Sequence, residues 1–274
     1  MTPAARNALA RALLAIADDE LVLGYRNTEW TGAAPVLEED VAFSSIGQDE
    51  VGHARLFYAL LHDLTGAPAD YRARRPDEYC HACFVETRTA PRYSPEGDHR
   101  GGSDWAYAIV RQYLYDLFDA ERLSALRDSS WDALAEAVDK VQREEKYHLQ
   151  HGRMWLDRLA GGGPAGRERL EAELERAWPH ALALFEPLDG EEVLVAERLS
   201  PVGARELRDR WLERLWPVFS AHHLALPGAR GGPGGWNVTV AAAEGGRNGR
   251  HTPDWEDLWN EMTSVYRLDP AAVW

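Results

Sequence analysis

Two Glu-x-x-His motifs constrain this chain more than any other feature of its sequence. The first pairs Glu50 with His53, and the second pairs Glu145 with His148. Residues three positions apart lie on one face of a helix, so the carboxylate and the imidazole of each motif can reach one metal ion. One such motif arises often by chance on a charged helix face. Two of them, each within a long helix, indicate a bundle that binds metal in its core.

Apolar residues recur at helical spacing through the first 160 residues and predict four helices. The first two fill the first 64 residues, on either side of a turn at 31–35 that ends in Pro35. The third is expected from about Asp104, a suitable N-cap, to Arg127, and the fourth from about Trp131 to Leu159. Asp128-Ser129-Ser130 would form the turn between them and supply the second N-cap. The remaining predictions are a long connection with at most one short helix at 66–103, helices at about 165–186, 202–220 and 255–266, and a glycine-rich surface loop at 227–250.

Bundles that hold two metal ions also take one carboxylate from each of the other two helices. Facing residues of an antiparallel helix pair lie equally far from the turn, so the partner of Glu50 is expected near residues 16–20. Asp18, Asp19 and Glu20 lie there, within an otherwise apolar stretch. Glu20, which precedes Glu50 by 30 residues, is the predicted ligand.

The same pairing rule points from Glu145 to residues 113–117, where Asp116 precedes it by 29 residues. Asp119 and Glu121 are alternatives that fit the pairing less well. Four carboxylates and two neutral imidazoles suit two adjacent divalent iron ions and leave positions open for oxygen. Four carboxylates without metal or protons would repel one another strongly in a core of low dielectric constant. The predicted metal ligands are Glu20, Glu50, His53, Asp116, Glu145 and His148.

These observations predict an all-α protein, a ferritin-like four-helix bundle with additional C-terminal helices. We expect one domain over residues 1–274, with the bundle core at about 6–160 and the C-terminal helices and glycine-rich loop at about 165–274. His151, three residues after His148, is expected to be an exposed neighbour of the site rather than part of it.

Composition narrows the functional classes. The 45 acidic and 30 basic residues give a formal net charge of −15, which argues against a nucleic-acid-binding protein. No apolar run approaches the roughly 18–20 residues of a membrane span, and the N-terminal residues lack the features of a signal peptide. We therefore expect a cytoplasmic protein that binds neither nucleic acid nor membrane.

Two other features of the long connection could bind ligands. The first is Cys80-His81-Ala82-Cys83, but a structural zinc site needs four ligands and no second cysteine pair exists, so we interpret the cysteines as incidental. The second is a group of arginines, which could meet the phosphates of coenzyme A or an acidic partner surface, or could simply be solvated. These are Arg72, Arg74, Arg75, Arg88 and Arg92.

Several segments resemble the phenylacetyl-CoA epoxidase family, whose complexes contain a catalytic A-type and a structural C-type subunit of one ferritin-like fold. The resemblance covers roughly residues 10–270, and in length and layout it is closer to the C-type. C-type subunits usually carry glutamine at the position of His53, whereas the motif around Glu50 resembles the A-type. The segments that resemble the C-type are Leu21 to Gly32, Asp104-Trp105 with Arg111-Gln112-Tyr113, Arg153-Met154-Trp155-Leu156, and Gly249-Arg250-His251-Thr252.

Carried over position by position, the A-type ligands fall on the six residues already named. The resemblance therefore implies two iron ions, with manganese or a mixed pair as alternatives, and an O2-dependent epoxidation of an aromatic ring attached to coenzyme A. It also implies an oligomer with A-type or C-type partner subunits and a separate reductase. Two other interpretations stay open: a C-type scaffold without catalytic function, and a stand-alone ferroxidase or other bundle oxidase.

Overall fold

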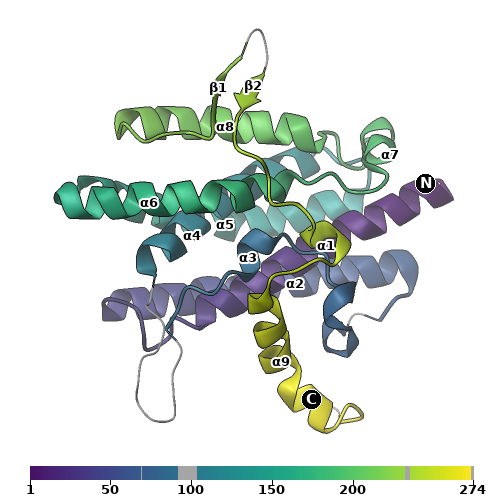
Figure 1. Cartoon of the computed structure of the whole chain (residues 1–274). Coiled ribbons are helices and arrows are strands. Elements are labelled where there is room, and N and C mark those ends of the chain that lie inside the picture. The colour runs from purple at the N-terminus through teal and green to yellow at the C-terminus, as the bar shows by residue number, and fades with distance from the viewer. Residues whose placement is uncertain (69, 92–103, 232–234, 273–274) are drawn as a thin grey trace.

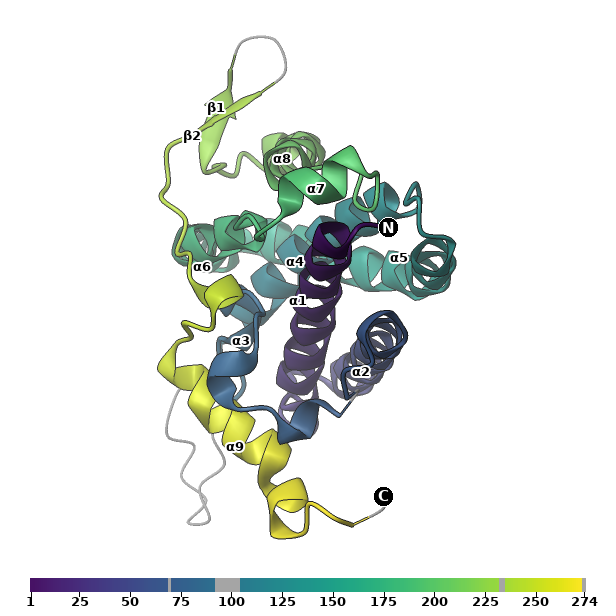
Figure 2. The same ribbon diagram turned by 90° about the vertical axis from the view of Figure 1, so that its right-hand side faces the viewer.

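Four long helices form the bundle in the computed structural model, which describes residues 1–68, 70–91, 104–231 and 235–272. They are α1 (Pro3–Thr28), α2 (Leu37–Thr65), α4 (Trp105–Leu126) and α5 (Asp132–Gly161). Figure 2 looks along α1 and shows α2 beside it, with α4 and α5 forming the second pair. The predicted all-α four-helix bundle is therefore confirmed.

Three of the four bundle helices have an ordinary cap at one end. The Thr2 hydroxyl accepts a hydrogen bond from the Ala5 N–H and precedes Pro3, and the Asp104 carboxylate accepts one from the Tyr107 N–H at 3.0 Å. Helix α2 ends at Gly66, whose φ of 75° is the left-handed conformation that glycine adopts readily. The predicted serine cap of α5 is wrong: Trp131 occupies that position, and no side chain caps the helix.

A glycine contact brings α1 and α2 unusually close. A Cβ atom at Gly24 would lie 2.9 Å from the carbonyl oxygen of Gly47, and one at Gly47 would lie 2.8 Å from the carbonyl oxygen of Gly24. The two backbones therefore touch one turn away from Glu20 and Glu50. In the second hairpin, a Cβ at Gly152 would lie 3.1 Å from the Cα of Tyr113, one turn from His148 and Asp116 respectively.

Further helices pack around the bundle: two lie on the second hairpin, whereas the last, Pro253–Leu268, lies against the connection between α2 and α4 (Figure 1). They are α6 (Gly163–Leu182), continued by the 3-10 turn η3 (Ala183–Phe185), then α7 (Glu191–Ala196), α8 (Ala204–Ala221) and α9 (Pro253–Leu268). Three of these match the predicted C-terminal helices, whereas α7 was not expected. The glycine-rich segment also contains an unexpected antiparallel pair of short strands, β1 (Gly228–Arg230) and β2 (Trp236–Val238).

In its described residues, 66–68 and 70–91, the connection between α2 and α4 is mostly irregular, as expected. Its regular parts are the 3-10 turns η1 (Tyr71–Ala73) and η2 (Pro76–Glu78) and the single-turn helix α3 (Cys83–Glu86). One more 3-10 turn, η4 (Gly246–Asn248), lies before α9. Arg92 falls outside the described residues. No helix within the described parts of the chain is long and apolar enough to cross a membrane.

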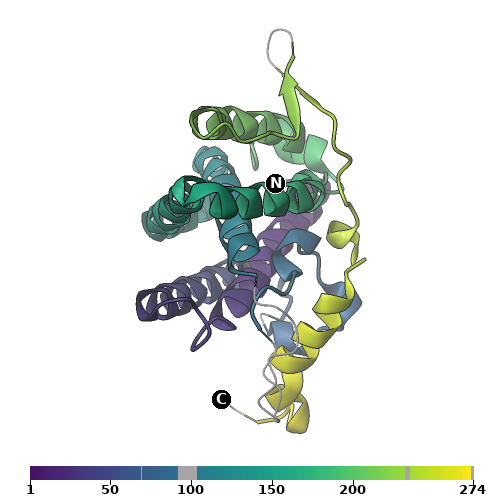
Figure 3. The ribbon, with the colours of Figure 1, turned by 60° about the vertical axis from the view of Figure 1, so that its left-hand side comes forward.

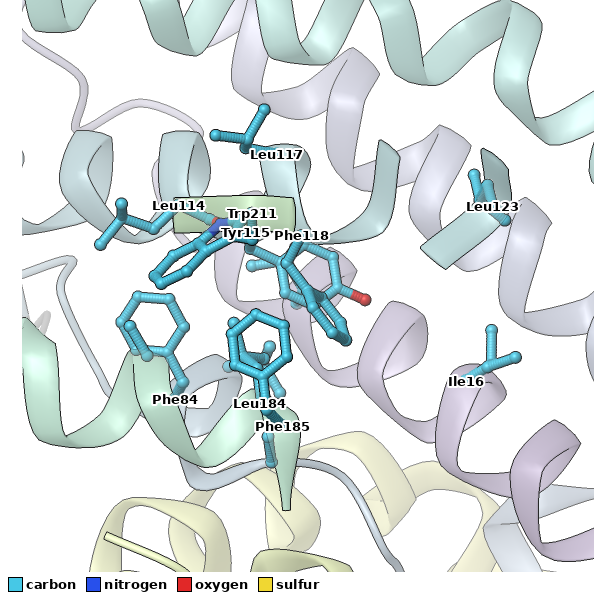
Figure 4. Packing of buried hydrophobic residues seen from close by; sticks show 14 of the residues in the cluster. Ile16, Phe84, Leu114, Tyr115, Leu117, Phe118, Leu123, Leu184, Phe185 and Trp211 are labelled. Carbon is cyan, nitrogen blue, oxygen red and sulfur yellow. The ribbon is translucent and has the colours of Figure 1, made fainter. Parts of the chain in front are cut away.

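Aromatic residues fix the outer helices to α4 (Figure 4). The ring of Phe185 packs against Phe118 and Trp211, with centroid distances of 5.2 Å in both cases. The indole N–H of Trp211, from α8, donates to the backbone carbonyl of Leu114 on α4 at 3.0 Å. Helix α4 is thus buried along nearly its whole length. Its carboxylates Asp116 and Asp119 are fully buried and need partners inside the protein.

Candidate metal centre

The six predicted ligands meet in the centre of the bundle, and none of them is more than 4% exposed. The Nδ1 atom of His53 lies 3.6 Å from Oε2 of Glu20, 3.6 Å from Oε2 of Glu50 and 3.1 Å from Oε1 of Glu145. One possible ligand atom from each of these four residues lies within 4.8 Å of the others. The α1–α2 hairpin thus contributes three of the four, and α5 contributes the last.

The remaining two residues lie on the side of α4 and α5. The Nδ1 atom of His148 is 3.2 Å from Oε1 of Glu145 and 3.6 Å from Oε1 of Glu50. Asp116 accepts a hydrogen bond from the side-chain amide of Gln112 through one oxygen, at 2.6 Å, and its other oxygen has no partner. The structure therefore brings all six residues into one buried region, with Asp116 and His148 outside the tightest group of four.

Eight side-chain atoms of these residues are buried without a hydrogen-bond partner. Buried polar atoms in proteins are almost always hydrogen-bonded, so this concentration requires an explanation. All eight are oxygen or nitrogen atoms of the kind that bind divalent iron, and the two imidazoles both present Nδ1. The residues therefore fit a pair of metal ions. The atoms are Oε2 of Glu20, both Oε of Glu50, both Oε of Glu145, Oδ2 of Asp116, and Nδ1 of His53 and of His148.

Without metal, protons balance the charge of this cluster. Burial alone would lower the pKa of both histidines. The carboxylates of Glu145 and Glu50 outweigh burial, raising the pKa of His148 to about 12 and raising that of His53 as well. Burial and neighbouring carboxylates raise the pKa of Glu20 and Asp116 well above their usual range. Both imidazoles are therefore protonated at neutral pH in the metal-free form, and a metal ion that binds there must displace protons.

Each imidazole of the site is also held from outside by a carboxylate. Oε2 of Glu144 lies 2.8 Å from Nε2 of His53, and Oδ2 of Asp49 lies 3.3 Å from Nε2 of His148. Each acid belongs to the opposite helix, so the two contacts cross between α2 and α5. A carboxylate that accepts the Nε2–H of an imidazole fixes its tautomer and directs Nδ1 at the metal. Sequence reasoning missed both acids, although each directly precedes a predicted glutamate ligand.

Glu20 is oriented by neighbours that sequence reasoning also missed. Its Oε1 atom accepts hydrogen bonds from the Tyr115 hydroxyl at 2.7 Å and from Arg122 at 2.8 Å, which leaves Oε2 to face His53. Arg122 also contacts Asp119, one of the two alternative ligands. Burial raises the pKa of Asp119 to about 7. The other alternative, Glu121, forms an ion pair with Arg214 at 2.6 Å and points away from the centre.

The acids next to Glu20 have their own partners. Asp18 binds both terminal nitrogens of Arg74, at 2.6 and 2.8 Å, and Asp19 binds those of Arg247, at 2.8 and 2.9 Å. Asp18 and Asp19 are therefore structural. Since Arg74 is committed to Asp18 in the interior, it is also not available for a coenzyme A phosphate.

A cleft of about 250 Å³ leads from the surface to the site between α2 and α5. His148 forms part of its wall, and Asp49 and Glu144 line its rim. His151 also lines the cleft, but the expectation that it is an exposed neighbour is wrong: its side chain is 14% exposed and Nε2 lies 2.8 Å from Oε2 of Glu39.

Comparison with known proteins agrees with this architecture. A solved structure from Synechococcus, described as a protein with aldehyde deformylating oxidase activity, superposes with a TM-score of 0.56 over 77% of this chain and 91% of its own. At 19% sequence identity, this similarity shows a common ferritin-like fold and nothing more.

Two proteins of Escherichia coli K12, both components of 1,2-phenylacetyl-CoA epoxidase, are similar in sequence. The C-type subunit of that enzyme is 29% identical over 98% of this chain and 100% of its own length. The A-type subunit is 26% identical over 83% of this chain and 71% of its own length. The profile of the family described as phenylacetic acid catabolic protein matches residues 1–274. The chain therefore belongs to the family of phenylacetic acid catabolic proteins, which confirms the resemblance found in its sequence.

Proposed function

We propose that this chain is one component of a multicomponent oxygenase similar to phenylacetyl-CoA epoxidase, and that its bundle binds two iron ions which take part in O2 activation. The observation that carries the proposal is the set of eight unpartnered buried atoms contributed by the six predicted ligands. A protein with only a scaffolding role would have no physical reason to keep so many unsatisfied groups in its core.

The protein's own residues would have three tasks. Glu50 and Glu145 carry two unpartnered oxygens each and lie close to the imidazoles, so they would hold the metal ions through their carboxylates. His53 and His148 would each bind one ion through Nδ1, with Glu144 and Asp49 fixing their tautomers. Arg122 and Tyr115 would hold Glu20 in place. The two ferrous ions, when bound, supply the redox chemistry for O2 reduction.

Anaerobic loading with ferrous iron tests the proposal. Elemental analysis should find about two iron ions per chain in the bundle, and Glu50→Ala and His148→Ala should each lower the iron content by one to two ions. Glu136→Ala is a matched control, because Glu136 is an exposed residue on the same helix as His148. Iron contents that are equal in all four proteins would refute the proposal.

The alternative function is a C-type scaffold that binds and stabilises a catalytic A-type partner. Its support is the similarity to the C-type subunit of Escherichia coli, which spans more of this chain than the similarity to the A-type subunit. Co-expression with an A-type protein and a reductase separates the two functions. If the chain is catalytic, epoxidation of an aryl-coenzyme A thioester is lost in Glu50→Ala while the complex still forms. If it is a scaffold, activity survives in Glu20→Ala and Glu145→Ala.

A further inference from the structure

A second cluster of metal-binding side chains lies outside the bundle, where the C-terminal segment crosses α3. Figure 3 shows this segment descending along one side of the molecule from the β1–β2 hairpin to α9. His81 and Glu86 are fully buried beside it, and the side chain of His251, just before α9, is 5% exposed. Possible ligand atoms of these three residues lie within 4.8 Å of one another.

We propose that His81, Glu86 and His251 bind one divalent metal ion of the zinc class, and that this ion joins the C-terminal segment to α3. Two imidazoles and one carboxylate are a frequent ligand set for zinc. The site is separate from the bundle centre and shares no residue with it.

The hydrogen bonds of His251 direct a lone pair into this cluster. Its Nε2 atom lies 3.1 Å from the backbone carbonyl of Tyr79, which can only accept, so Nε2 carries the proton of a neutral ring. Nδ1 then presents its lone pair toward Oε2 of Glu86, 2.9 Å away, and has no hydrogen-bond partner. A contact between this nitrogen and a buried carboxylate oxygen needs a cation, which is either a proton on Nδ1 or a metal ion, and the proposal assigns the metal ion. Metal-binding histidines are oriented in this way by carbonyl groups.

The other two side chains complete the arrangement. Oε1 of Glu86 accepts the backbone N–H of Thr252 at 2.5 Å, which leaves Oε2 for both imidazoles. Nε2 of His81 lies 2.6 Å from that same oxygen, and the two rings stack with centroids 4.1 Å apart and planes inclined by 12°.

A modest adjustment would admit the ion. Ligand bonds of about 2.0–2.1 Å in a tetrahedral zinc site separate neighbouring ligand atoms by about 3.3 Å. The observed separations of 2.6 and 2.9 Å would have to open by about half an ångström, which small side-chain rotations provide. Trp255 closes the cluster from outside, with its ring 4.4 Å from that of His81. Three protein ligands would leave the fourth position of a tetrahedral ion to a water molecule.

The cysteines of Cys80-His81-Ala82-Cys83 are not assigned as ligands. Burial and the carboxylate of Glu86 raise the pKa of Cys83 to about 12, and its thiol faces the carbonyl oxygen of Arg250 at 3.4 Å. Cys80 contributes its backbone rather than its thiol, through a hydrogen bond from its N–H to Asp18 at 2.8 Å. The histidine between them is the residue of this motif that the proposal uses.

Zinc binding can be measured without interference from the bundle. The variant Glu50→Ala/His148→Ala removes ligands of the bundle centre, and we expect it to retain about one zinc ion per chain after loading with zinc chloride and dialysis. Adding His81→Asn or His251→Gln should abolish this ion, whereas adding Cys80→Ser should not. Circular dichroism checks that each variant is folded.

X-ray absorption on the zinc-loaded bundle variant tests the ligands without changing the cluster. It should show two imidazole nitrogens and oxygen at about 2.0–2.2 Å, with no sulfur near 2.3 Å. No zinc in the folded bundle variant, or zinc retained in both histidine variants, would show that the three side chains form only a hydrogen-bonded contact. These outcomes are independent of the iron content of the bundle, so the two proposals can fail separately.

Discussion

Arg247 connects the C-terminal segment to the interior of the bundle, and its removal should destabilise the protein measurably. Arg247 is 4% exposed and Asp19 is fully buried, and two hydrogen bonds of 2.8 and 2.9 Å join them. We consider Arg247→Met, which keeps most of the apolar stem and removes the charge. Asp19 then loses its bidentate partner in a region that water cannot reach.

The size of the loss in stability depends on the hydrogen bonds that Asp19 keeps in the variant. Breaking a buried ion pair on one side costs about 3–5 kcal/mol, because the remaining charge is left uncompensated. Asp19 keeps Arg122 at 3.0 Å and the N–H of Ala82 at 2.9 Å, so we expect the lower end, about 3 kcal/mol. For a chain of 274 residues the entropy of unfolding is about 0.6 kcal/mol per kelvin, so Tm should fall by about 5 °C.

The loss should also depend on pH. Burial would raise the pKa of Asp19, but Arg247 and Arg122 hold it below its usual value. A carboxyl group with a depressed pKa stabilises the folded state above its unfolded pKa of about 3.9, and this contribution is lost as the pH falls through the folded pKa. The difference in stability between the native protein and Arg247→Met should therefore be largest at neutral pH and should shrink below about pH 4.

Urea denaturation followed by circular dichroism at pH 7 and at about pH 3 measures both effects. Arg210→Met is the matched control, because Arg210 pairs with Glu206 on the surface of α8, where both side chains are at least 44% exposed. We expect the control to lose less than about 1 kcal/mol. Equal losses in the two variants, or a loss in Arg247→Met that does not change with pH, would refute the reasoning.

Three further predictions concern the bundle centre. Glu144→Gln should weaken divalent metal binding about tenfold in a chelator competition, because the amide can no longer fix the tautomer of His53 as a carboxylate does; unchanged affinity would contradict that role. The pKa of His148 is raised to about 12, so a metal ion that binds there must displace its proton. For each proton released, the metal affinity should rise about tenfold per pH unit between about pH 7 and 9. An affinity that does not change with pH would contradict this coupling. Gly47→Ala should cost about 1–3 kcal/mol in urea denaturation, because the new methyl group would meet the carbonyl oxygen of Gly24; a variant as stable as the native protein would disprove a tight contact.

The sequence was sufficient to predict the bundle and the places of its central carboxylates. Helical periodicity and turn position determine which residues of a hairpin face each other, so Glu20 and Asp116 could be selected from among several acids. Their location in the centre agrees with that selection, while their role as metal ligands stays a prediction. Asp18 shows why neighbouring acids could not be excluded from sequence alone: its partner Arg74 is 56 residues away and in an irregular segment.

The features that the sequence did not reveal are ones that no local pattern encodes. Asp49 and Glu144 cross between helices of different hairpins, and the register of that crossing cannot be read from a turn. His251 lies 165 residues from Glu86 and precedes a helix in a part of the chain without periodicity. The strands β1 and β2 are three residues long, too short for alternation to be recognised.

The contact between Gly24 and Gly47 also determines how the molecule can open. Two backbones in direct contact cannot slide past each other without a clash, so α1 and α2 should move as one rigid body. Helices α2 and α5 instead meet across the cleft through long side chains, which can change rotamer at little cost. Any widening that admits a molecule larger than water to the centre should therefore occur along the seam between the two hairpins, with each hairpin retaining its shape.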